Sequence, residues 1–271
     1  MNYKLILHPG SNLVQEFTSI PHGVTSLDLS LNNLYSISTV ELIQAFANIP
    51  ASVTSLNLSG NSLGFKNSDE LVQILAAIPA NVNSLNLRGN NLASKNCAEL
   101  AKFLASIPAS VTSLDLSANL LGLKSYTELA YIFSSIPNHV VSLNLCLNCL
   151  HGLSLENLEL LKDSLKPLQT VYLDYDIVKN MSKEQRQALG AVFPNIQKII
   201  LVDYYGKELH PSQSITIANL IRELSGKTDV PSLLNQSILF AKGHQTNIKA
   251  LNIPDELKES IQTCKPANLS D

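Results

Sequence analysis

Hydrophobic and polar positions recur along this chain with a nearly constant period. The pattern Leu-x-Leu-x-x-Asn-x-Leu occurs five times, and successive copies are 29 residues apart. Its copies begin at Leu27, Leu56, Leu85, Leu114 and Leu143. Looser copies at 28-residue steps begin at residues 171 and 199, and a truncated copy around 5–7 precedes the series. Because self-similarity at such a period is typical of solenoids, we expect about eight stacked units over residues 1–205.

Each copy predicts a short strand followed by a turn. Alternating leucines such as Leu27 and Leu29 are typical of a strand with one buried face. The turn leaves backbone groups without strand partners, and a buried asparagine can satisfy them because it both donates and accepts hydrogen bonds. We assign this structural role to Asn32, Asn61, Asn90, Asn119 and Asn148. In the looser copies, Asp176 and Tyr204 stand at the same phase.

The second half of each unit is predicted to be a helix. Residues that favour helix N-caps recur at the 29-residue step, and in four units a glutamate lies three residues later, which is the pattern of a capping box. The predicted caps are Ser38, Asn67, Asn96, Ser125 and Ser154. Strands pack about 4.8 Å apart and helices about 8–10 Å apart, so the stack is expected to curve with its strands on the inside.

The repeat resembles that of a known family. The motif LxxLxLxxNxL, with a helix and a unit of 28–29 residues, is similar to the ribonuclease-inhibitor-like class of leucine-rich repeat proteins over roughly residues 1–205. The amino-acid sequence of residues 49–63 also resembles the leucine-rich repeat effectors of Legionella. The resemblance implies an α/β solenoid with a concave parallel sheet and helices on the convex side. It further implies a protein that a type IV secretion system injects into the host cytoplasm, where it binds a host protein.

Residues 206–271 differ from the repeats, and we expect them to form a helical C-terminal cap. Residues 212–225 have a helical pattern that Gly226 ends, and 230–242 and 254–263 are further helical segments. The end of a solenoid exposes apolar surface and needs such a cap. A separate functional module is the alternative, and by the resemblance the extreme C terminus could carry a translocation signal.

Composition excludes several classes of function. Only 15% of the residues are charged and the net charge is −3, which argues against a nucleic-acid-binding protein. The sequence has no apolar run of the roughly 18 residues that a membrane span needs, and the N-terminal apolar stretch is too short for a signal peptide. Four cysteines in a chain of 271 residues do not form a disulfide framework. We therefore expect a monomeric protein with reduced cysteines in a cytoplasm. By the resemblance, that compartment is the host cytoplasm.

No residue pattern predicts catalysis. Cys146 and Cys149 form a Cys-x-x-Cys motif followed by His151, but the sequence offers no second ligand pair for zinc. The six histidines are scattered and none lies in a recognised catalytic motif. We expect no enzyme activity, no metal and no cofactor. The alternative is an enzyme whose site lies between the last repeats and the C-terminal helices.

Three lysines stack at the 29-residue step on the loop before each helix, at Lys66, Lys95 and Lys124. Such a column could hold an acidic partner. A glutamate follows each lysine by four residues, however, which favours a solvated rim of mixed charge.

The concave face is the expected surface for a protein partner. Its strand residues are small and polar in the first five units, whereas binding energy concentrates in aromatic and arginine side chains. Four of the eight tyrosines fall within 172–205, so we predict a site centred on the strands at 170–174 and 198–202. The predicted site comprises Tyr172, Asp174, Tyr175, Lys198, Ile200, Val202 and Tyr205. The alternative is that these tyrosines pack beneath the cap.

Overall fold

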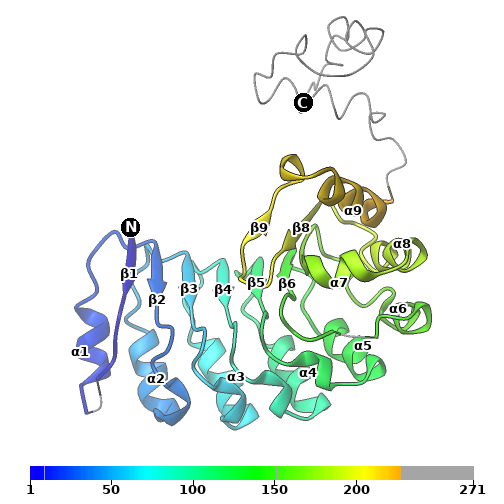
Figure 1. The fold of residues 1–271 in the computed structure, drawn as a ribbon. Coiled ribbons are helices and arrows are strands. Elements are labelled where there is room, and N and C mark those ends of the chain that lie inside the picture. Colours follow the sequence, from blue (N-terminus) through cyan, green and yellow to red (C-terminus); the bar gives the residue numbers. More distant parts are fainter. Residues whose placement is uncertain (9, 151, 227–271) are drawn as a thin grey trace, which may run out of the picture.

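Eight parallel strands lie side by side in the order of the sequence and form one curved sheet (Figure 1). The computed structural model describes residues 1–8, 10–150 and 152–226. A ninth strand pairs antiparallel with the eighth at the end of the sheet. The strands are β1 (Asn2–Lys4), β2 (Ser26–Asp28), β3 (Ser55–Asn57), β4 (Ser84–Asn86), β5 (Ser113–Asp115), β6 (Ser142–Asn144), β7 (Thr170–Asp174), β8 (Lys198–Val202) and β9 (Glu208–Leu209).

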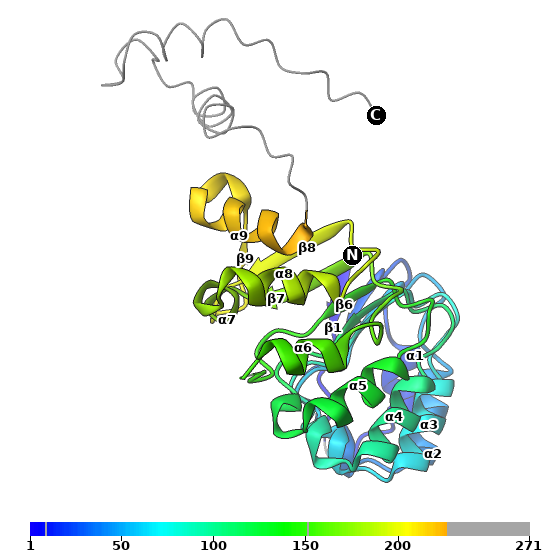
Figure 2. The ribbon, with the colours of Figure 1, turned by 90° about the vertical axis from the view of Figure 1, so that its right-hand side faces the viewer.

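Helices cover the convex side of this sheet, as the side view in Figure 2 shows. They are α1 (Leu13–Thr18), α2 (Thr39–Phe46), α3 (Ser68–Ala76), α4 (Cys97–Ala105), α5 (Tyr126–Ser134), α6 (Leu155–Leu161), α7 (Tyr175–Asn180), α8 (Lys183–Ala191) and α9 (Ile215–Ser225). Short 3-10 helices lie between strand and helix in four units and before α9: η1 (Leu34–Ser36), η2 (Leu63–Phe65), η3 (Leu92–Ser94), η4 (Leu121–Leu123) and η5 (Pro211–Gln213). The expected α/β solenoid with its strands on the inside is confirmed.

The repeat places equivalent residues in register across the sheet. Leu27 pairs with Leu56, and Leu56 pairs with Leu85. These leucines point toward the helices and are almost completely buried in the core that the sheet and helices share. Their strand neighbours, such as Ser26 and Asp28, are half-buried on the concave side.

The asparagine ladder predicted from the repeat is confirmed. Asn90 has no exposed surface, and its side-chain oxygen accepts hydrogen bonds from the backbone N–H of Asn61 at 3.0 Å and of Leu63 at 3.2 Å. Its amide nitrogen donates to the carbonyls of Leu58 and Leu87. The same bonds recur one unit on, so each asparagine satisfies backbone groups of two neighbouring turns.

The predicted helix caps are also confirmed. The five residues expected at the N-caps each accept a hydrogen bond from an amide in the first turn of their helix. At Asn67, Asn96 and Ser125 the glutamate three residues later also reaches back to the backbone N–H of the cap. The N-terminus of each of these five helices is therefore capped within its own unit.

The asparagine ladder does not continue into the looser copies, although Asp176 and Tyr204 stand at the equivalent positions of the repeat. Helix α7 begins directly after β7, which leaves Asp176 exposed in its first turn. Instead Asp174 accepts a hydrogen bond from the backbone N–H of Leu147 at 2.9 Å. Tyr204, which could have been buried in the next copy, is 75% exposed. The turn geometry thus changes after β6.

The lysine column is neither a docking site nor a solvated rim. Lys66 and Lys95 are buried, only 6% and 8% exposed. Each Nζ donates to a backbone carbonyl of the preceding unit: Lys66 to Ile37, Lys95 to Lys66 and Lys124 to Lys95. These carbonyls end or follow the 3-10 helices, so the lysines form a second ladder that satisfies them. Burial lowers the pKa of the Lys66 ammonium group.

The described C-terminal part packs on the last repeat through one helix. The helix expected over 212–225 occupies Ile215–Ser225, and Gly226 follows it with a φ of 63°. Arg186 on α8 forms a half-buried ion pair with Glu223 on α9 at 2.5 Å. Helix α9 approaches α8 so closely that a Cβ on Gly190 would lie 1.8 Å from the carbonyl oxygen of Leu224. The helices predicted over 230–242 and 254–263 lie outside the described residues.

Candidate protein-binding surface

The concave side chains of the first units are engaged in the fold. One aspartate or asparagine per strand accepts, through its Oδ1, the backbone N–H two residues later. This column comprises Asp28, Asn57, Asn86, Asp115 and Asn144. Such Asx turns fix the chain as it leaves each strand. The sequence contains a signal for these turns, because an aspartate or asparagine recurs at one position of each unit. That pattern alone suggests polar side chains that are free to bind a partner, whereas the structure shows them bonded to the backbone.

At the C-terminal end of the sheet, apolar side chains on the concave face pack against one another and are not exposed. Cys146, Ile200 and Val202 form a small buried cluster, 1%, 6% and 4% exposed, against which Leu147 and Tyr172 pack. Cys146 follows β6, whereas Ile200 and Val202 lie on β8, two strands away. The concave sides of β6 and β8 therefore approach each other across β7. The expectation that Ile200 and Val202 face a partner is therefore wrong.

The turn between β8 and β9 presents two tyrosines to solvent. Tyr204 is 75% exposed and Tyr205 is 89% exposed, and their rings meet edge to face with centroids 5.7 Å apart. Asp203 fixes the turn, because its Oδ1 accepts the backbone N–H groups of Tyr205 and Lys207, each at 2.9 Å. The aromatic pair is thus held on an ordered turn rather than on a free loop.

This turn reaches toward the middle of the concave face. A Cβ on Gly206 would lie 3.8 Å from Nη1 of Arg88, which is on the unit of β4. The same Nη1 donates to the hydroxyl of Ser117 at 3.2 Å, and Ser117 is completely buried. Arg88, which is half-buried, is therefore the concave side chain of the regular repeats that lies beside the aromatic turn.

The other predicted site residues lie in different environments. Tyr172 is half-buried on the concave side. The pKa of its hydroxyl is raised, mainly by burial and to a smaller extent by the carboxylates of Glu208 and Asp115. Lys198 is exposed at the start of β8. Tyr175 packs instead against the core between sheet and helices, with Nζ of Lys179 5.5 Å from its ring.

The predicted residues thus divide into four groups rather than one surface. Tyr172, Lys198 and Tyr205 keep exposed surface, and Asp174 accepts a hydrogen bond from the backbone N–H of Leu147. Tyr175 packs on the helix side, and Ile200 and Val202 are buried. Sequence reasoning missed Tyr204 and the approach of Arg88. Two consecutive tyrosines before a glycine were the available signal for the exposed turn.

The described residues contain no arrangement that suggests catalysis. The Cys146 thiol is buried. Its pKa is raised, mainly by burial and further by the nearby Asp174 and Asp115, and this disfavours the reactive thiolate. Within these residues there is no group of three His, Cys, Asp or Glu side chains suited to a metal ion. No helix in the same part of the chain is both long and apolar enough to cross a bilayer.

A solved structure agrees with the repeat architecture. The leucine-rich repeat-containing protein LegL7 from Legionella pneumophila is 67% identical in sequence and matches 86% of this chain and 100% of its own, with a TM-score of 0.55. This chain belongs to the leucine-rich repeat proteins. No family model matches it, and no curated protein matches it.

The leucine-rich repeat assignment confirms the resemblance to Legionella proteins of this class. A leucine-rich repeat solenoid of this kind supports a protein-interaction module in general, since its stacked units present an extended concave surface. The aromatic turn lies in the part of the solenoid where the regular 29-residue repeat has ended.

Proposed function

We propose that this leucine-rich repeat chain is a secreted bacterial effector that binds a host protein, and that the aromatic turn at 203–207 is its main contact. The observation that carries the proposal is the exposure of Tyr204 and Tyr205 on a turn that Asp203 holds in place. Tyrosine is among the residues that dominate interface energies. A fixed aromatic pair also loses little conformational entropy when a partner binds.

The surroundings of the turn support a composite surface. Arg88 lies beside Gly206 and supplies a second residue type that is enriched at interface hot spots. Tyr172 and Lys198 extend the surface along β7 and β8. The buried cluster of Ile200, Val202 and Cys146 lies beneath and keeps the hairpin rigid rather than contacting the partner.

The first experiment uses the intact chain as bait in host-cell lysate and compares it with Tyr204→Ala/Tyr205→Ala. The expected result is a partner that the native chain retains and the double variant loses. The matched control is Tyr35→Ala/Phe65→Ala, which removes another exposed edge-to-face pair, 6.3 Å between centroids, at the opposite end of the array. A partner lost with the control pair and kept by the Tyr204/Tyr205 variant would move the contact to the first units.

A second experiment tests the effector role separately from the binding surface. A reporter fused to the chain is expected to enter the host cytoplasm from bacteria with an intact type IV secretion system and not from bacteria that lack it. Equal reporter signal from both strains, or none from either, would contradict secretion by this route.

A further inference from the structure

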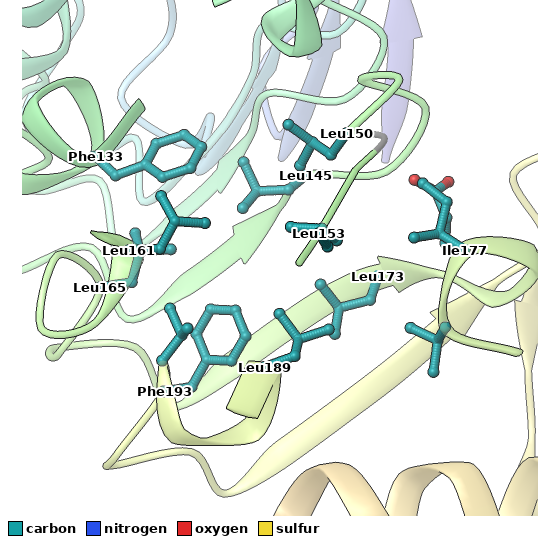
Figure 3. Close-up of a pocket in the computed structure, with 13 residues that line it drawn as sticks. Phe133, Leu145, Leu150, Leu153, Leu161, Leu165, Leu173, Ile177, Leu189 and Phe193 are labelled. Atoms are coloured by element: carbon teal, nitrogen blue, oxygen red, sulfur yellow. The ribbon is translucent and has the colours of Figure 1, made fainter. Parts of the chain in front are cut away.

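The junction between the sixth and seventh units differs from the junctions between the regular units. In four earlier units a 3-10 helix lies between strand and helix, but none lies between β6 and α6 in the described residues. A cavity of about 40 Å³ lies behind this junction, enclosed by apolar side chains of α5 to α8 and of the strands, as Figure 3 shows. Leu145, directly after β6, and Leu173 on β7 border it.

The cavity adjoins a larger groove at the surface. The groove has a volume of about 490 Å³, and Leu150, Leu153 and Ile177 line both it and the cavity. Met181 adds a further apolar wall, and polar residues including Asp176 and Asn180 form its rim. An apolar floor with a few polar groups and a volume between about 300 and 1,000 Å³ is typical of sites that bind another molecule or segment.

The chain leaves the described structure beside this groove. Glu223, in the last turn of α9, pairs with Arg186, and the guanidinium of Arg186 also donates to the carbonyl of Met181 in the groove wall. One arginine side chain therefore spans the distance between the end of α9 and the groove. Gly226 ends α9 three residues later, and 45 further residues follow it in the sequence.

The sequence of residues 230–242 suits an apolar groove. At helical spacing most of its apolar side chains fall on one side, whereas Leu239 falls on the other side with asparagine, glutamine and lysine. That apolar side consists of Val230, Leu233, Leu234, Ile238, Phe240 and Ala241. Residues 227–229 in extended form and a helix over 230–242 together reach about 30 Å, at roughly 3.3 Å per extended residue and 1.5 Å per helical residue.

We propose that residues 230–242 of this chain occupy the groove, with their apolar side against Leu150, Leu153 and Ile177. The segment then completes the core at the point where the 3-10 helix is missing, and the cap of the solenoid lies over its sixth and seventh units as well as its end. This inference is independent of the proposed host partner.

The test uses a fluorescent reporter in the full chain, which contains no tryptophan. Phe240→Trp is expected to show blue-shifted emission and acrylamide quenching at least threefold weaker than Asn247→Trp, a polar position beyond 230–242. Equal quenching at the two positions would overturn the proposal. Hydrogen exchange of the native chain provides the second measurement: residues 230–242 are expected to be protected, and exchange at the rate of an open chain would also overturn it.

The groove is tested by blocking its rim in the Phe240→Trp background. Asn180→Phe adds a ring at an exposed rim position and is expected to raise quenching to that of Asn247→Trp, whereas Lys183→Phe, exposed outside the groove, is expected to change nothing. If Asn180→Phe has no effect, the segment lies elsewhere and the proposal fails. It also fails if shielding of the tryptophan grows with protein concentration, because a second copy then supplies the segment.

Discussion

The regular units from β2 to β6 and the last two units build one parallel sheet by different means. In the regular units the 29-residue repeat produces three polar ladders: the buried asparagines, the lysines that bond carbonyls, and the Asx residues of the concave face. In the last two units the asparagine is replaced, α7 follows β7 at once, and the sheet closes on an apolar cluster. Side chains that could bind a partner are bonded internally in the first region and free on the turn in the second.

This comparison shows what a repeat encodes. Strict recurrence satisfies backbone groups between units, and it leaves the concave surface polar and occupied by internal bonds. Where recurrence fails, the chain exposes Tyr204 and Tyr205 and opens a cavity and a groove. Departures from the repeat are therefore where we place both proposals.

The largest difference in stability is expected between two substitutions at equivalent positions of the repeat, one in each region. Asn90→Leu removes the donors to Leu58 and Leu87 and the acceptor for Asn61 in a fully buried turn, at a cost of about 3 kcal/mol or more. Asp176→Leu, at the equivalent phase but exposed, is expected to change the free energy of unfolding by less than about 0.5 kcal/mol. Urea unfolding of both variants checks this, and similar costs would remove the distinction between the regions.

A somewhat smaller effect is expected where α9 meets α8. Gly190→Ala places a Cβ against the carbonyl of Leu224, so α9 must shift, at a cost of about 1–3 kcal/mol. Gln187→Ala, exposed on the same helix, serves as the control. Thermal unfolding measures the loss of stability, and hydrogen exchange of the native protein measures the protection of α9. Unchanged protection of α9 in Gly190→Ala would contradict the close packing.

The lysine ladder predicts a pH dependence confined to the regular units. The folded-state pKa of Lys66 lies below its unfolded value, so its charged form is disfavoured in the native protein. The free energy of unfolding of the native chain, relative to Lys66→Met, is therefore expected to rise as pH increases from below the folded pKa toward about 10.5, where the unfolded lysine titrates. Urea titrations of both proteins between these pH values measure the difference. A difference that stays constant or falls would refute the buried ammonium.

The smallest effect concerns the left-handed residues beside the asparagine ladder. Leu120 has a φ of 61° and is exposed, whereas asparagine stands at the equivalent positions 33 and 91. Because asparagine tolerates this conformation better than leucine, Leu120→Asn is expected to stabilise the protein by about 0.5–1 kcal/mol. Leu123→Asn, exposed on the same turn without a positive φ, is the control. An equal gain in the two variants would mean that it comes from replacing an exposed leucine by a polar residue and not from the backbone conformation.

Sequence reasoning succeeded for elements that each unit encodes by itself and failed where contacts between units decide the outcome. The strands, the caps and the role of Asn90 followed from a fixed phase, because each position has the same neighbours in every unit. Burial of Ile200 and Val202 depends on how far the sheet curls at β6 to β8, which no single unit encodes. The lysine ladder was visible as a column, but its carbonyl partners lie in the preceding unit and only the three-dimensional stack brings them together.

The central claim is that the regular units provide the frame while the aromatic turn binds the partner. The most direct test measures, for the captured partner, the Kd and the free energy of unfolding of Tyr204→Ala/Tyr205→Ala and of Tyr35→Ala/Phe65→Ala. We predict that the first variant binds at least tenfold more weakly with nearly unchanged stability, since both rings are exposed, and that the second binds like the native chain. Native affinity in the first variant, with loss in the second, would contradict the claim.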